Sequence, residues 1–172
     1  MSDPRIEKLA QVLVDYSVSI RPKDRVAVIG SPAAEPLIES VVVEILNAGG
    51  YPLSIVQLPG IGELTFRHAS DDQLRHIPEP MKVVFETYDA IVSLMSSVNT
   101  KAMTNVAPEK LMLASQAQQE IMQTMLQRTA KGEFSWVGTL YPTHAYAQDA
   151  EMGLAEYEDF VYAACLPDFD DP

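Results

Sequence analysis

The sequence lacks several features that would place the protein in a specialised class. It has a single cysteine, Cys165, which excludes an internal disulfide and fits a reducing compartment. No apolar run approaches the length that a membrane-spanning helix needs. The first residues, MSDPRIEK, carry charges where a signal peptide would be apolar. A cytoplasmic protein that does not span a membrane is therefore expected.

Basic residues are also scarce. Lys and Arg total 12 against 24 Asp and Glu, which gives a net charge of −12. A nucleic-acid surface needs clustered Lys and Arg, so nucleic acid is not an expected partner. The same excess of acid opposes docking on anionic lipid. No Lys or Arg follows Lys131, and residues 133–172 hold nine carboxylates, so the acidity is a local property of this segment.

What the sequence does contain is a regular alternation of apolar patterns. The 172 residues are 47% hydrophobic, which suits one domain with one sizeable core. Short apolar runs predict buried strands, and residues at helical spacing predict the helices between them. Strands are expected at 26–29, 53–58, 90–95 and 134–140. The first main helix is expected at 4–17, and the second ends at the cap 47–50. Further helices are expected at 81–88, 108–131 and 153–166.

This order predicts an α/β fold: a doubly wound, mostly parallel sheet with helices on both faces, in three layers, flavodoxin-like or Rossmann-like. One or two short helices are expected between 59 and 80. In the last helix, Leu154, Tyr157, Val161, Ala164 and Cys165 are expected on the buried face. Ala155, Glu158, Asp159 and Tyr162 are expected on the exposed face.

Ligands of parallel sheets bind beyond the carboxyl ends of the strands, so reactive groups would be expected there. The loop GSPAAEP after the first strand has neither dinucleotide-binding nor P-loop spacing, and Ser31 alone does not make a flavin site. Cys165 has no histidine at a helical interval and is interpreted as a small buried hydrophobe. The residues show no catalytic constellation.

Two groups of ionisable residues also have a structural interpretation. His68, Asp71, Asp72 and His76 have the atom types of a metal site, but their scattered spacing favours a solvated surface. The carboxylates Glu151, Glu156, Glu158 and Asp159 lie near the start of the last helix, where acids interact favourably with the helix dipole.

The segment SWVGTLYPTHAYAQDAEMGLAEYEDFVYAACL resembles the corresponding segment of the thermophilic metalloaminopeptidases, the family that includes aminopeptidases T, S and II. The opening RIEKLAQVLVDYSVSIRPKDRVAV is similar to the start of that family. The residues that carry the resemblance are Trp136, Pro142, Thr143, Tyr146, Ala147, Glu156, Tyr157, Glu158, Asp159 and Phe160. Tyr146 stands where the family commonly has tryptophan.

The resemblance implies that residues 1–166 are the amino-terminal domain of such an enzyme and residues 167–172 its junction to a missing carboxyl-terminal domain. The whole enzyme would be a homodimer that releases amino-terminal residues from peptides. Its cobalt, zinc or magnesium ligands would belong to the missing domain, so no metal or catalytic residue is expected in this segment.

The domain itself would then form part of the substrate cleft. Asn99, Thr143 and His144 are candidates for the cleft wall, and Glu156, Glu158 and Asp159 for the domain junction. Two alternatives remain open at this point: a stand-alone α/β interaction domain, and a doubly wound domain that binds a nucleotide or flavin.

Overall fold

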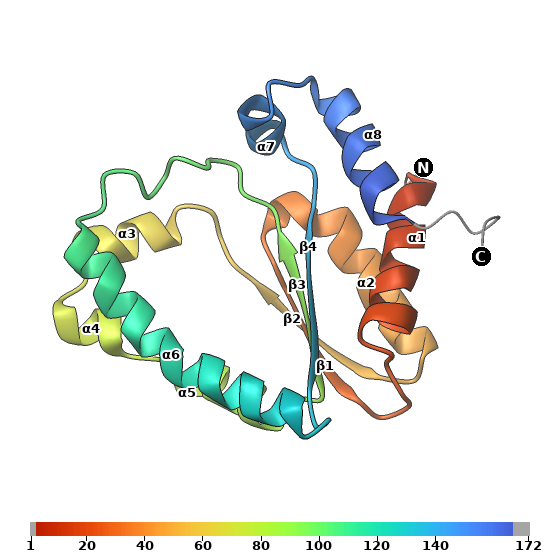
Figure 1. The fold of residues 1–172 in the computed structure, drawn as a ribbon, viewed down its shortest axis with the longest axis horizontal. Helices are drawn as coiled ribbons and strands as arrows, with labels where there is room; N and C mark the ends of the chain where they lie inside the picture. Colours follow the sequence, from red (N-terminus) through yellow and green to blue (C-terminus); the bar gives the residue numbers. More distant parts are fainter. Residues whose placement is uncertain (1–2, 167–172) are drawn as a thin grey trace.

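In the computed structural model, which describes residues 3–166, four parallel strands form one sheet. The strands are β1 (Arg25–Gly30), β2 (Tyr51–Val56), β3 (Ala90–Met95) and β4 (Ser135–Leu140), in the order β2-β1-β3-β4. Helices lie on both faces of the sheet (Figure 1). The predicted α/β fold with a doubly wound parallel sheet is confirmed, and the strand order is that of the first four strands of a flavodoxin-like sheet.

One face of the sheet carries the larger core. It is covered by α1 (Pro4–Gln11), the π-helical η1 (Val12–Ser17), α2 (Glu35–Asn47) and α8 (Leu154–Cys165). Asp3 caps α1 by accepting a hydrogen bond from the Arg5 N–H, and Pro4 occupies the first turn. The largest fully buried side chains of this core are Leu9, Val14, Val26, Val28, Leu37, Val41, Ile45 and Val92.

The opposite face is more thinly packed. It carries α3 (Ile61–His68), α4 (Asp71–Arg75), α5 (Glu79–Thr87) and α6 (Pro108–Ala130). Its core consists of Ala27, Val84, Ile91 and Phe134 with partly buried neighbours. No residue of α3 or α6 is buried, although α6 is 23 residues long. These helices splay away from the upper part of the sheet (Figure 1).

Several local expectations need correction. β2 runs from Tyr51 to Val56, not from 53 to 58. A short helix, α7 (His144–Asp149), follows β4, and the 3-10 turn η2 (Pro32–Ala34) precedes α2; neither was expected. In α8, Tyr162 is buried and Ala164 is exposed, the reverse of the prediction.

The orientation of α8 has a physical cause. The Arg5 guanidinium lies 4.7 Å from the centroid of the Tyr162 ring, so this ring faces α1. Ala164, two residues later in the helix, then faces outward. Within residues 3–166 no helix is both long and apolar enough to cross a bilayer.

Candidate functional site

A cavity of about 420 Å³ opens at the carboxyl ends of β1, β2 and β3. It lies where open parallel sheets bind ligands and within the size range of small-molecule sites. Its wall consists of three strand ends, the loops that follow them, and one side chain of α7. The lining residues are Ile29, Gly30, Ser31, Gln57, Leu58, Pro59, Gly60, Ser93, Leu94, Met95, Ser96, Ser97, Val98, Asn99, Ala102, Met103 and Tyr146.

Two serines hold the floor of this cavity together. The Ser31 hydroxyl donates to the Ser96 carbonyl at 2.9 Å and lies 2.8 Å from the Ser96 hydroxyl. It also accepts from the Ala33 N–H at 3.3 Å and so caps η2. The Ser31 hydroxyl and the Ala33 N–H group already form hydrogen bonds within the protein. In the loop after β1 these groups therefore stabilise the fold and do not bind a phosphate group.

Gly30 has a packing role that explains its place at the end of β1. A Cβ atom on Gly30 would lie 3.1 Å from Ile38 Cδ1 and 3.4 Å from Leu94 Cβ. A side chain here would press on Ile38, which would have to shift by a few tenths of an ångström, so the glycine favours close contact between β1, α2 and β3. A nucleotide-binding glycine would instead admit the approach of a ligand to the backbone.

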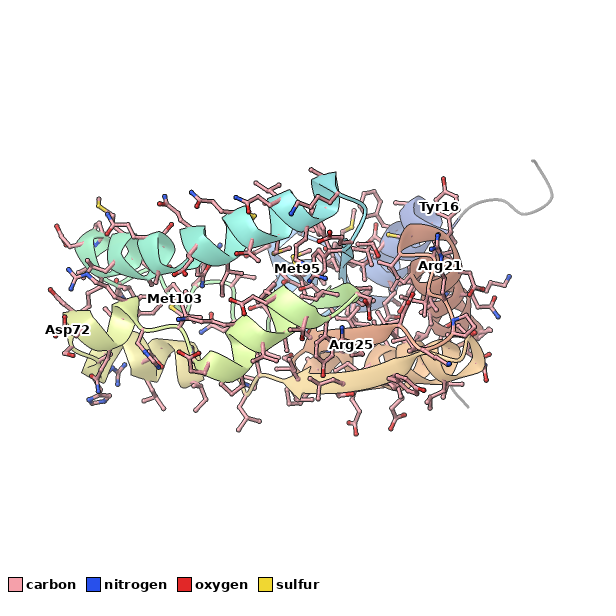
Figure 2. The ribbon with its side chains drawn as sticks, turned by 90° about the horizontal axis from the view of Figure 1, so that it is seen from below. Tyr16, Arg21, Arg25, Asp72, Met95 and Met103 are labelled. Atoms are coloured by element: carbon pink, nitrogen blue, oxygen red, sulfur yellow. The ribbon has the colours of Figure 1, made fainter. Side chains whose placement is uncertain are left out.

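The chemistry of the lining is neutral. It offers the amides of Gln57 and Asn99 and the hydroxyl of Ser97 beside apolar surface, and no Asp, Glu, Lys or Arg is among the described lining residues. Met95 and Met103 line the cavity, and Met103 lies between α6 and the short helices α3 and α4 in Figure 2. Such a wall suits uncharged amide groups and apolar side chains, as in a peptide main chain, better than a phosphate.

Of the three residues predicted for the cleft wall, Asn99 lines the cavity. Its side-chain oxygen accepts a hydrogen bond from the Lys101 N–H at 3.0 Å. Thr143 lies behind the wall: its hydroxyl donates to the Ser97 carbonyl at 2.7 Å and accepts from the Tyr146 N–H at 3.3 Å.

His144 is exposed at the start of α7 and is not among the lining residues. Tyr146, which sequence reasoning did not place at the site, does line the cavity because Thr143 caps the helix that carries it. The structure thus brings Asn99 and Tyr146 to one cavity, with Thr143 in support.

The acidic residues predicted for the junction lie on α8. Asp159 pairs with Arg5, whereas Glu156 and Glu158 form no ion pair with another described residue. Burial, followed by the Glu158 carboxylate, raises the pKa of Tyr141. Burial also raises the pKa of Tyr162. Tyr141, which follows β4, and Tyr162, which belongs to α8 itself, therefore stay neutral at physiological pH.

Within residues 3–166 no three His, Cys, Asp or Glu side chains lie close enough together to hold a metal ion. His68 ends α3, and Asp71 and Asp72 begin α4, where Ser70 forms a capping box with Gln73. His68, Asp71, Asp72 and His76 are all exposed, in agreement with their interpretation as surface. The predicted junction, residues 167–172, lies outside the described residues.

Comparisons with known proteins give the following findings. The family described as thermophilic metalloprotease (M29) matches residues 2–172. The structure of wild-type AmpT from Thermus thermophilus is similar, with a TM-score of 0.75 and 16% sequence identity. That similarity covers 94% of this chain but 42% of AmpT, so the chain spans less than half the length of that relative.

A second solved structure, the CurK enoyl reductase, has a TM-score of 0.35 and 12% identity over 91% of this chain and 58% of its own. It is too dissimilar to carry an argument. None of the curated proteins matches the chain.

Proposed function

Because the chain belongs to the thermophilic metalloprotease (M29) family, we propose that it is the non-catalytic amino-terminal domain of a metal-dependent aminopeptidase. The observation that carries the proposal is the family match over residues 2–172. In this proposal the whole enzyme is a homodimer that releases amino-terminal residues from peptides. Its divalent ion, cobalt, zinc or magnesium, is held by a second domain that follows the junction at 167–172.

The neutral cavity supports a role as one wall of the peptide cleft. An aminopeptidase that accepts varied sequences has to contact the peptide main chain and apolar side chains, and the lining offers groups for both. Asn99 and Tyr146 would contact the peptide, and Thr143 would position Tyr146 through its cap. The exposed imidazole of His144 would contact a longer peptide at the rim.

The acidic helix α8 would form the junction with the catalytic domain and attract the positively charged amino terminus of a peptide. Glu156, Glu158 and Asp159 supply the charge. Asp159 has a second task, because it also binds Arg5. Glu156 and Glu158 are therefore the residues with which an electrostatic role can be tested without breaking the ion pair between Arg5 and Asp159.

Reading the source gene downstream of codon 172 tests the proposal directly. We expect an open frame that encodes a second domain with dispersed Glu, His, Tyr and Asp residues able to bind a metal. A stop codon at that point would overturn it, because no described group of this chain can hold the metal. The protein would then be a stand-alone interaction domain.

A kinetic experiment on the intact enzyme tests the role of α8. The double variant Glu156→Gln, Glu158→Gln should raise KM for a peptide with a charged amino terminus, leave kcat unchanged, and weaken the dependence of KM on salt. Glu39→Gln with Glu86→Gln removes the same charge from exposed positions on other helices and serves as the control. Equal KM values for the α8 variant and the wild type across a salt series would contradict the role.

A further inference from the structure

A second cavity, of about 440 Å³, lies on the α6 side of the sheet and has no part in the proposed peptide cleft. Its walls come from the sheet, from α4 and α5 with the segment that joins them, and from α6. On the sheet side it shares Ile29 and Gln57 with the cavity at the strand ends, so the two cavities are neighbours. Its volume falls within the range of small-molecule sites, roughly 300–1,000 Å³.

The space exists because α6 presents small side chains toward the sheet. Ala114 and Ala117 both line the cavity, and residues three apart lie on the same face of a helix. Ile121 and Met125 continue this face in steps of four residues and line the cavity too. All four are half-buried, and none of the 23 residues of α6 is buried. The inward face of α6 is therefore apolar but incompletely covered, and a ligand in the cavity would cover it.

The wall opposite α6 is also apolar. It includes Leu74, which is buried, and the half-buried Met81 and Phe85. Methionine side chains are flexible, so Met81 and Met125 can adapt to the shape of a ligand. No Asp, Glu, Lys or Arg is among the described residues that line this cavity. The interior therefore favours apolar groups and opposes the entry of a charged one.

Polar side chains are found where the cavity meets solvent. The polar residues of the lining are Gln57, His76 and Gln118, and all three are exposed. Two carboxamides and an imidazole can form hydrogen bonds with a neutral donor or acceptor. A carboxylate or phosphate would find no Lys or Arg in the described lining and would approach a chain whose net charge is −12.

We propose that this cavity binds an uncharged, mainly apolar small molecule with one hydrogen-bonding group, of the class of a short-chain alcohol or alkyl amide. Its apolar part lies between the inward face of α6 and the side chains of Met81 and Phe85. Its polar group meets Gln57, His76 or Gln118. Binding covers apolar surface of α6 and so stabilises the folded chain. This inference rests on the cavity and not on the peptidase assignment, so either can fail without the other.

The experiment adds octan-1-ol to the 172-residue chain, isotope-labelled at the methionine methyl groups, and follows these groups by NMR. We expect saturable shifts of the signals of Met81, Met122 and Met125, which line the cavity. The thermal midpoint should rise with the concentration of the alcohol. Met152 packs in the small cluster between α7 and α8, so its signal should not move.

One variant fills the cavity. Ala117→Leu places a larger side chain in the space and should weaken the binding of octan-1-ol about 10-fold. Its thermal midpoint without ligand should stay equal or rise, because the side chain enters space that is already there. Ala114→Leu makes the same test one helical turn away if the first variant folds poorly. Ala130→Leu is the matched control, since Ala130 is exposed at the end of the same helix and does not line the cavity; its affinity should equal that of the wild type.

A second ligand tests the neutral class. Octanoate has an alkyl chain similar to that of octan-1-ol but ends in a carboxylate, and it should bind about 10-fold more weakly than the alcohol at neutral pH. Octanoate that binds as tightly as octan-1-ol would contradict the proposal.

Three other results would overturn it. The first is the absence of a saturable shift at any methionine up to the solubility of octan-1-ol. The second is a shift confined to Met95 and Met103, which would place the alcohol in the cavity at the strand ends. The third is an equal affinity of the wild type, Ala117→Leu and Ala114→Leu, since the alcohol would then bind outside this cavity.

Discussion

At the scale of single residues, Arg5 joins the two ends of the described chain. Its guanidinium donates to Asp3 at 2.7 Å, pairs with Asp159 on α8, and lies 4.7 Å from the Tyr162 ring centroid. Residues 133–172 hold no Lys or Arg, but the structure brings a cation to them from the first helix. Sequence spacing could not predict this, because the pair is separated by 154 positions.

The hydrogen bond from the Arg5 side chain, more than its charge alone, lowers the pKa of Asp3. A carboxyl group whose pKa is lower in the folded state binds protons more readily after unfolding. Its stabilisation is therefore present above the ordinary Asp pKa of about 4 and is lost as pH falls through the folded-state pKa. Arg5→Gln should lower the free energy of unfolding at neutral pH by about 1 kcal/mol, as expected for a partly exposed network.

Urea denaturation across a pH series checks this prediction. The difference between wild type and Arg5→Gln should shrink as pH falls below about 4, because protonated Asp3 no longer attracts Arg5. Arg21→Gln is the control: Arg21 is exposed, and its side chain is in no ion pair with another described residue. A difference that grows toward acid would contradict the prediction.

At the scale of elements, the sequence predicts buried strands better than edges and short helices. Both ends of β3 match the predicted run 90–95, because a strand buried on both faces is apolar throughout. The predicted β2 was two residues late. Its apolar run continues through Leu58, which lies in the loop that lines the cavity. The predicted strand left out Tyr51 and Pro52, although an edge strand tolerates a proline.

The short helix α7 shows why part of the candidate site could not be predicted. HAYAQD has six residues, too few for a helical period to stand out. The sequence predicted a place for Thr143 in the cleft wall. A threonine just before a helix is also a typical N-cap, and here it accepts a hydrogen bond from the Tyr146 N–H. Had the cap been recognised, Tyr146 would have been placed near the strand ends. The position of the cavity itself follows from the parallel sheet.

Arg128 anchors α6, a helix of 23 residues of which none is buried. Its guanidinium donates to the carbonyls of Phe85, Tyr88 and Glu133 at 2.8–3.0 Å and lies 5.3 Å from the Phe134 ring. It thereby ties the end of α6 to the end of α5. Arg128→Met keeps much of the apolar stem but removes these donors, and should destabilise the fold by about 2 kcal/mol.

Chemical denaturation with hydrogen exchange of α6 amides measures that loss. Exchange should quicken first in the last turns of α6 and at the end of α5, because these segments lose their shared anchor. Lys131→Ala changes an exposed cation just beyond the same helix and should have little effect. If Arg128→Met and Lys131→Ala were equally stable, the guanidinium contacts would not be what holds α6.

At the scale of the whole molecule, the two faces of the sheet are unequal. The face of α1 and α2 has a continuous core, whereas the other face holds the cavity at the strand ends and a second one of about 440 Å³ between α5 and α6. Ile29 and Gln57 line both. Exposed apolar side chains continue over α6 at Met112, Met122 and Leu126. This distribution concentrates the candidate binding surface on one side of the sheet.

Charge is also unevenly distributed, because the carboxylates of residues 133–172 have no Lys or Arg within that segment. This uneven charge should make the stability of the chain sensitive to salt. The net charge is −12, and the described cations that reach the acidic segment are Arg5 at Asp159 and Lys101 at Asp149. Raising salt from about 0.01 to about 0.1 M shortens the Debye length from about 30 to about 10 Å. Repulsion summed over many carboxylates is then screened, while exposed ion pairs, each worth little, lose less.

We therefore expect the thermal midpoint to rise by about 3 °C over this range, which corresponds to about 1 kcal/mol. Sodium chloride and potassium chloride should act alike, whereas sulfate would add its own effect on apolar burial. Glu156→Gln with Glu158→Gln should reduce the slope, because it removes two charges that have no cationic partner among the described residues. A midpoint that falls with salt would mean that the ion pairs of Arg5 and Lys101 outweigh the repulsion between the carboxylates.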